Sequence, residues 1–213
     1  MPFTAAPSGA LVHYVDFDLH SESLQAPISE PVVLIHGLGC NWRHWSRQIG
    51  WLAHCRRVVA PDIRGGSGKT RRPSLGWSTA GMAADVHAVV ADLGLRHPAL
   101  VGISMGGTVA LQYALGYPAD INRLVAVDSL PEIPPEFSAV RDAQTAYIQT
   151  RTLREIAEER MAVAFTGGAD PATKRWVIEM IAAGDIEGYR AQVLATVSFD
   201  VRDRLREITV PPR

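Results

Sequence analysis

Four short, continuous apolar runs divide the chain, and segments with helical periodicity separate them. The runs are PVVLIHG (31–37), RRVVAPD (56–62), ALVGIS (99–104) and RLVAVDS (123–129). Continuous apolar runs of this length are typical of strands that are covered on both faces. Their alternation with helices therefore predicts an α/β fold, in which helices flank a mostly parallel sheet.

A helix is predicted between the second and third runs, with Ser78 as its N-cap and Gly94 at its end. The earlier segment ALVHYVDFDL (10–19) alternates apolar and polar residues more strictly, so we expect an antiparallel strand at the edge of the sheet. The predicted helix carries one apolar stripe, made of Met82, Val86, Val89, Val90 and Leu93.

From residue 131 onward the patterns are helical only. Asp170 and Pro171 form an N-cap and first-turn pair that begins one of these helices. We therefore predict a core over residues 1–130 and a helical lid, or cap, over residues 131–205. Residues 206–213 are predicted to begin the next strand of the core.

Composition narrows the classes of partner. The net charge of −1 gives no electrostatic reason to expect nucleic acid or an anionic membrane. No apolar run approaches the roughly 20 residues that a membrane span needs. The two cysteines, Cys40 and Cys55, show neither metal-ligand nor disulfide spacing, and the N-terminus shows no secretion signal. We expect a cytoplasmic protein that binds a small-molecule substrate without metal or cofactor, in an oligomeric state that the sequence does not define.

The segment IRGGSGKT (63–70) ends like a nucleotide-binding P-loop. That motif requires G-x-x-x-x-G-K-[ST], and Ile63 stands where its first glycine should be. The motif must also lead into a helix, whereas Pro73 and Gly76 interrupt any helical pattern here. The sequence therefore disfavours nucleotide binding and leaves this loop to be explained otherwise.

The segment VGISMGG contains a G-x-S-x-G pattern formed by Gly102, Ser104 and Gly106. The pattern lies where a strand should end at Ile103 and a helix should begin at Met105. A serine on such a sharp turn adopts a strained backbone conformation with an exposed Oγ, and glycines on either side avoid collisions with the neighbouring strand and helix. Ser104 is therefore a candidate nucleophile; a tight turn without chemistry is the alternative.

A nucleophile that attacks an acyl group also needs donors for the developing oxyanion. His36 and Gly37 end the first buried run, and a turn there would direct the backbone N–H of Leu38 toward the same point as the N–H of Met105. The backbone N–H groups of Leu38 and Met105 are thus the candidate oxyanion hole.

The ordered set of H-G-x-G after a strand, PDIRGGSG and G-x-S-M-G-G resembles the α/β-hydrolase fold family over nearly the whole chain. It is most similar to the branch of esterases, lactonases, cofactor-free haloperoxidases and carbon-carbon bond hydrolases. The resemblance implies that His36 shapes its loop and that the D-x-R-G-x-G loop, here one residue longer between Gly66 and Gly68, is structural. It also implies serine chemistry, since epoxide hydrolases and haloalkane dehalogenases carry aspartate at this turn.

In this family the nucleophile is followed by an acid and then a histidine, but no histidine occurs after His97. Asp128 is a candidate acid, with a purely structural strand-end residue as the alternative. The upstream histidines are predicted to be surface or packing residues.

The terminal DRLREITVPPR (203–213) is similar to the helix and I-x-V-P segment that precede the family's next strand, so we expect a chain truncated before its acid and histidine. Such a chain would leave the 123–129 strand with an unpaired edge and would be poorly stable and nearly inactive. The predicted function is hydrolysis of a small ester, lactone or related acyl compound, catalytically incomplete in this chain. The alternative is a non-catalytic ligand-binding protein on the same scaffold. The expected pocket walls are Trp42, Trp45 and Met105, with packing of the aromatic side chains in the core as the alternative.

Overall fold

The computed structural model describes residues 2–19, 30–71, 76–132, 146–165 and 167–209. Within these residues a six-stranded sheet has the order β1-β2-β4-β3-β5-β6. The predicted α/β class is confirmed, and each predicted strand is present with slightly shorter bounds. The strands are β1 (Phe3–Ala5), β2 (Leu11–Phe17), β3 (Val32–Ile35), β4 (Val58–Pro61), β5 (Ala99–Ile103) and β6 (Arg123–Val127).

The sheet is parallel from β4 to β6, whereas β2 pairs antiparallel with β4. The antiparallel direction predicted for residues 10–19 is confirmed, but the predicted edge position is wrong. The chain reverses at Gly9, whose φ is +82°, and the N–H of Ala6 donates to the carbonyl of Ala10 at 2.9 Å. This turn returns β1 along the outer side of β2, so that β1 forms the edge.

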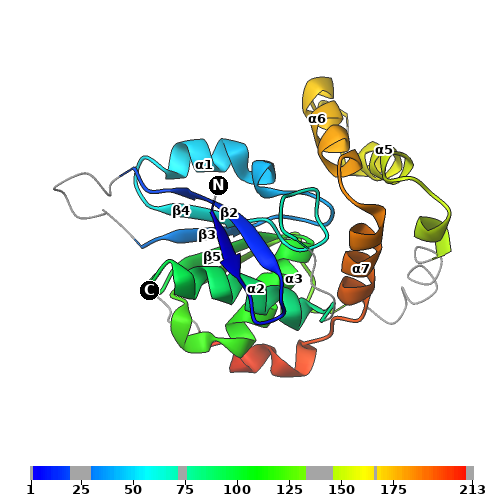
Figure 1. Cartoon of the computed structure of the whole chain (residues 1–213). Coiled ribbons are helices and arrows are strands. Elements are labelled where there is room, and N and C mark those ends of the chain that lie inside the picture. The colour runs from blue at the N-terminus through cyan, green and yellow to red at the C-terminus, as the bar shows by residue number, and fades with distance from the viewer. Residues whose placement is uncertain (1, 20–29, 72–75, 133–145, 166, 210–213) are drawn as a thin grey trace.

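Helices cover both faces of the sheet: α1 (Ser46–Leu52) lies on one face, and α2 (Thr79–Asp92) and α3 (Met105–Gly116) lie on the other (Figure 1). The two-residue period of β3 explains this layering, because alternate side chains point to opposite faces. Val32 and Leu34 pack into the cluster under α1. Val33 and Ile35 pack into the larger cluster under α2 and α3.

The predicted start of α2 is confirmed, since the Ser78 hydroxyl accepts a hydrogen bond from the N–H of Gly81 at 3.0 Å. None of the helices in the described part of the chain combines the length and the apolar character that a membrane span requires.

Strand β6 departs from the expectation that all four apolar runs are covered on both faces. Among the described strands it pairs only with β5. Val125 is 45% exposed and Val127 is 40% exposed. An apolar edge of this kind can pair with other chains, and the predicted unpaired edge is confirmed for the described residues.

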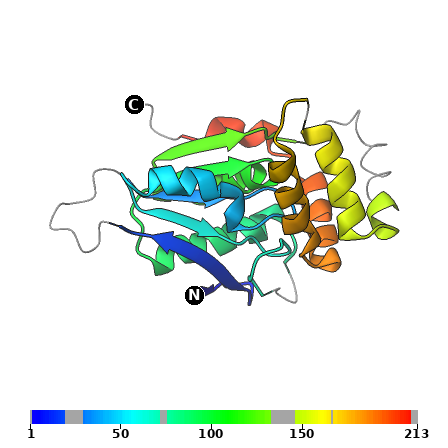
Figure 2. The same cartoon turned by 90° about the horizontal axis from the view of Figure 1, so that it is seen from above.

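The predicted helical segment contains α5 (Leu153–Ala164), α6 (Pro171–Ala182) and α7 (Ile186–Val197). These helices stand beyond the carboxyl ends of the parallel strands (Figure 2) and bury a cluster of their own around Ile156, Ile181 and Tyr189. The predicted N-cap of α6 is confirmed, because the Asp170 carboxylate accepts from two backbone N–H groups.

The two ends of this helical segment meet at the sheet. Glu132 forms an isolated antiparallel bridge with Asp200, and the N–H of Val201 donates to the carbonyl of Pro131 at 2.9 Å. The chain then forms the 3-10 helix η4 (Arg202–Glu207) and packs Ile208 against the main core. Residues 206 and 207 therefore complete η4 instead of beginning a strand, and residues 210–213 lie outside the described residues.

Candidate active site

Ser104 lies at the junction of β5 and α3 with φ 54° and ψ −124°. Two backbone hydrogen bonds hold this strained conformation: the N–H of Ser104 donates to Val127 at 2.9 Å, and its carbonyl accepts from Gly107 at 2.8 Å. The Ser104 hydroxyl makes no capping hydrogen bond to α3. Strain of this kind persists only where the surroundings enforce it, which is common at functional sites.

The glycines around Ser104 allow three backbone segments to meet. A Cβ at Gly102 would lie 2.1 Å from the carbonyl oxygen of Gly106, and one at Gly106 would lie 2.3 Å from the carbonyl oxygen of Ile35. A Cβ at Gly107 would lie 1.8 Å from the Ser129 hydroxyl. The start of α3 therefore sits directly against the ends of β3 and β5, which brings Met105 close to the loop after β3.

His36 fixes that loop with both of its ring nitrogens. Its Nε2 accepts from the N–H of Ile63 at 2.8 Å, and its Nδ1–H donates to the carbonyl of Gly37 at 2.9 Å. Burial lowers the pKa of His36, against the opposing influence of Asp62, so the ring is neutral. No free nitrogen is left for proton transfer, which agrees with the predicted role in shaping the loop.

The backbone N–H groups of Leu38 and Met105 are the two predicted donors near Ser104. Leu38 lies in the loop that His36 fixes, and its N–H donates to no carbonyl of another described residue. Met105 is the first residue of α3, where an N–H has no acceptor within the helix. Within the described residues, neither N–H group therefore has a backbone acceptor in its own loop or helix.

A cavity of about 240 Å³ brings Ser104 together with Leu38 and Asp128. The core contributes one side of this cavity, and α5 and α6 contribute the other. Asp128 is exposed and, like Ser104, has a positive φ, here 48°. The complete lining is Gly37, Leu38, Cys40, His44, Ile103, Ser104, Asp128, Arg160, Met161, Ala164, Phe165, Val177 and Ile181.

The predicted pocket walls are wrong, because the three side chains pack elsewhere. The ring of Trp42 lies 6.4 Å from that of Phe17, measured between centroids, and Trp45 is buried under α1. The side chain of Met105 is buried in the main core. None of the three is among the residues that line the Ser104 cavity.

His44 and Arg160 line the cavity but carry no signal in the sequence that would have identified them. His44 follows the loop after β3 in a polar segment, and its Nδ1 accepts from the N–H of Gly37 at 3.4 Å. Arg160 belongs to α5, far from Ser104 along the chain. Only the folding of α5 over the sheet brings Arg160 to the site.

The glycine-rich loop of residues 63–70 wraps a carboxylate of the protein itself. Asp62 accepts from the N–H of Trp42 at 2.8 Å and from the N–H of Lys69 at 2.9 Å, and it also contacts the His13 ring at 2.6 Å. A Cβ at Gly68 would lie 2.1 Å from the Asp62 carboxyl carbon. The loop therefore has no room for a phosphate, and its resemblance to a P-loop is coincidental.

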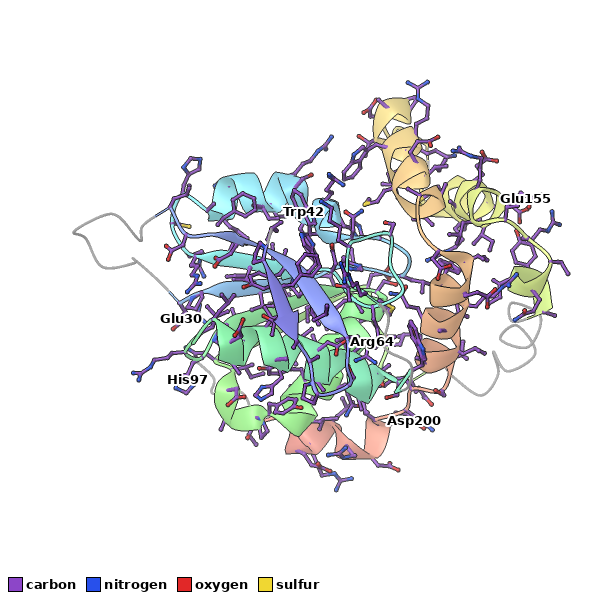
Figure 3. The ribbon with its side chains drawn as sticks, viewed as in Figure 1. Glu30, Trp42, Arg64, His97, Glu155 and Asp200 are labelled. Carbon is purple, nitrogen blue, oxygen red and sulfur yellow. The ribbon has the colours of Figure 1, made fainter. Side chains whose placement is uncertain are left out.

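Arg64, labelled in Figure 3, belongs to this loop and its side chain is completely buried. It forms an ion pair with Asp85 of α2, and it also donates to the carbonyls of Gly76 and Gly81 at 3.0 Å each. These contacts join the loop after β4 to α2, which agrees with the predicted structural role of the loop.

Burial of the two histidines at the site predicts a loss of stability in acid. Burial lowers the pKa of His44 from 6.5 to about 4, and the nearby His36 adds to this shift. The unfolded chain therefore binds a proton first as the pH falls, so the free energy of unfolding should decrease between about pH 6.5 and 4. Urea unfolding at several pH values measures this decrease.

A His44→Asn variant should lose less stability over this pH range than the unchanged chain. His97→Asn is the matched control, because His97 is exposed (Figure 3) and its removal should leave the slope unchanged. If the free energy of unfolding of His44→Asn fell with pH as steeply as that of the unchanged chain, His44 would not be the source of the acid sensitivity.

No cluster of three or more metal-ligating side chains occurs among the residues that the structure describes. The fold belongs to the α/β class, with a mostly parallel sheet between layers of helices. Within this class, a strained serine between a strand and the next helix is typical of hydrolytic enzymes. The chain is a member of the alpha/beta hydrolase fold family, whose model matches residues 30–166.

Two relatives match part of the chain. It is 39% identical over 97 residues to the "Putative carbamate hydrolase RutD" of Escherichia coli O9:H4 (strain HS), a match covering 46% of this chain and 36% of that protein. It is 36% identical over 101 residues to the soluble epoxide hydrolase of Corynebacterium sp. (strain C12), covering 47% of this chain and 35% of that protein. The matched segment thus spans about a third of the length of these relatives.

Among solved structures, an esterase from Exiguobacterium antarcticum is similar in fold, with a TM-score of 0.85 and 23% identity. The similarity covers 98% of this chain and 77% of the esterase. At this level of identity the comparison supports the fold alone.

Proposed function

We propose that this chain carries the nucleophile of a serine hydrolase that acts on a small ester, lactone or related acyl compound. The observation that carries the proposal is the strained Ser104, which opens onto a cavity shared with Leu38. Relatives named as carbamate and epoxide hydrolases agree with a hydrolytic reaction.

In the proposed reaction the Ser104 Oγ attacks the substrate carbonyl carbon and loses its proton to a base. The negative charge that develops on the carbonyl oxygen is stabilised by the N–H groups of Leu38 and Met105, each contributing about a hundredfold or more to the rate. The leaving group departs with a proton, and water then hydrolyses the acyl-enzyme. Asp128 is the proposed acid because this residue lines the same cavity as Ser104.

The general base would have to be a histidine near the Ser104 hydroxyl. His44 is the described histidine that lines the Ser104 cavity, but its Nδ1 accepts a hydrogen bond from Gly37. The proton of the neutral ring is therefore on Nε2, and a pKa of about 4 makes the ring a weak base. His13 contacts Asp62, His87 contacts Asp120, and His20 lies outside the described residues.

With His44 as a weak base, we propose that Ser104 forms an acyl-enzyme slowly and turns over poorly. An oxyanion hole and binding alone can leave roughly a thousandfold acceleration over water in a related triad system. We also propose that the helical segment between Glu132 and Asp200 acts as a cap, because α5 and α6 form one side of the Ser104 cavity.

A fluorophosphonate probe tests the nucleophile. We expect slow covalent labelling at Ser104 over a long incubation, identified by peptide mass spectrometry, and loss of labelling in Ser104→Ala. Ser198→Ala is a matched control, because Ser198 is exposed at the end of α7 and should not affect labelling. Undiminished labelling of Ser104→Ala would refute the proposal, and an unreactive Ser104 with saturable ligand binding would support the ligand-binding alternative.

A further inference from the structure

A second cavity, of about 560 Å³, lies beside the Ser104 cavity and is bordered by α5 and α7. Leu38, Arg160 and Ala164 line both cavities, so the two cavities adjoin at these residues. A substrate whose carbonyl lies at Ser104 would reach the larger cavity by extending past Arg160. The larger cavity has mainly aliphatic walls, contributed by Ile148, Ile156, Val163, Ala164, Val193 and Val197.

Tyr189 holds the guanidinium of Arg160 in this position. The Arg160 Nη1 donates to the Tyr189 hydroxyl at 2.7 Å, and Tyr189 is 2% exposed. The Tyr189 ring packs on Gly39, where a Cβ would lie 2.8 Å from the ring. Burial raises the pKa of Tyr189, so the phenol is neutral and leaves the positive charge of Arg160 uncompensated.

Among the described residues, Arg160 lacks the carboxylate partner that Arg154 has on the same helix. Arg154 forms an ion pair with Glu179 at 2.7 Å, whereas Arg160 has no carboxylate within ion-pair distance in the described part of the chain. Glu159 also borders the cavity but is exposed to solvent. A half-buried cation beside aliphatic walls is costly unless an anion binds to it.

We propose that Arg160 recognises a carboxylate of the substrate, so that the preferred substrates are esters or lactones of short dicarboxylic acids. This inference rests on the proposed function of Ser104 and names the substrate class. The planar guanidinium offers paired N–H donors that match a carboxylate. The aliphatic walls would contact the methylene chain between this carboxylate and the acyl carbon at Ser104.

Two p-nitrophenyl esters with acyl chains of equal length test the preference. The mono-p-nitrophenyl ester of glutaric acid carries the carboxylate, and p-nitrophenyl valerate lacks it. The acylation rate, measured as the first release of p-nitrophenol, should favour the glutarate ester. In Arg160→Gln the ratio of the two rates should fall roughly 10- to 100-fold, which is typical for the loss of a hydrogen-bonded charge pair.

Two further variants separate recognition from folding. Arg160→Lys keeps the charge but not the paired donors, and should retain part of the preference. Arg154→Gln removes an arginine from the same helix on its exposed side and should keep the full ratio. If Arg160→Gln folds with the unchanged ratio, the proposal is overturned.

A binding experiment makes the test independent of catalysis. Glutarate is titrated calorimetrically into Ser104→Ala and into Ser104→Ala/Arg160→Gln. We expect saturable binding to the first and at least about tenfold weaker binding to the second. Binding that depends on Arg160 would support the substrate class even if Ser104 proved unreactive, whereas the absence of glutarate binding to Ser104→Ala would overturn it.

Discussion

Replacing Arg64 by methionine is expected to lower the free energy of unfolding by about 3 to 5 kcal/mol, because it leaves a buried carboxylate without its partner. Arg64 and Asp85 are both completely buried. The substitution would also leave the carbonyls of Gly76 and Gly81 without their donor. Each buried polar group that loses its partner adds a desolvation cost of about 1 to 3 kcal/mol.

Urea unfolding followed by circular dichroism measures this effect. Arg154→Met is the matched control: the pair of Arg154 with Glu179 also has two hydrogen bonds, but it is exposed, so its loss should cost at most about 1 kcal/mol. The double variant Arg64→Met/Asp85→Leu should recover stability relative to Arg64→Met, because it removes the stranded charge. Equal losses for Arg64→Met and Arg154→Met would show that burial of the ion pair contributes nothing.

The order of the apolar runs sufficed to predict the α/β class and four of the strands. The local composition of each run suffices to form a strand. Only β6 is not buried as predicted, because the burial of a strand also depends on the elements that pack beside it. The edge position of residues 10–19 could not be predicted in the same way. It depends on three residues of β1, too few to give a pattern, and on the turn that returns them alongside β2.

The position of Ser104 was predictable because the motif reflects backbone geometry: Gly102 and Gly106 are placed where no side chain fits. The walls of its cavity were not predictable. Trp42 follows the loop after β3 along the chain, but its ring turns toward Phe17. Arg160 and Met161 reach the cavity only because α5 folds over the carboxyl ends of the strands. A local sequence pattern does not predict this packing between distant segments.

Replacing Gly106 by alanine is expected to destabilise the protein and to impair the site together. The added Cβ would lie 2.3 Å from the carbonyl oxygen of Ile35 and 2.6 Å from that of His36, and backbone atoms of a buried strand have little freedom to move. Overpacking of this kind costs about 1 to 3 kcal/mol, and more where nothing can shift. We expect about 3 kcal/mol, measured by urea unfolding.

The same substitution should slow labelling of Ser104 by the fluorophosphonate, because any relief of the clash moves the start of α3 away from β3. That movement would separate the N–H of Met105 from the N–H of Leu38. Gly116→Ala is the control within the same helix: no atom lies within 4 Å of a Cβ there, so stability should change by less than about 1 kcal/mol and labelling should be unaffected. A Gly106→Ala variant with unchanged stability and labelling would mean that the close approach of α3 to β3 is not required. The proposal that the N–H groups of Leu38 and Met105 act together would then be wrong.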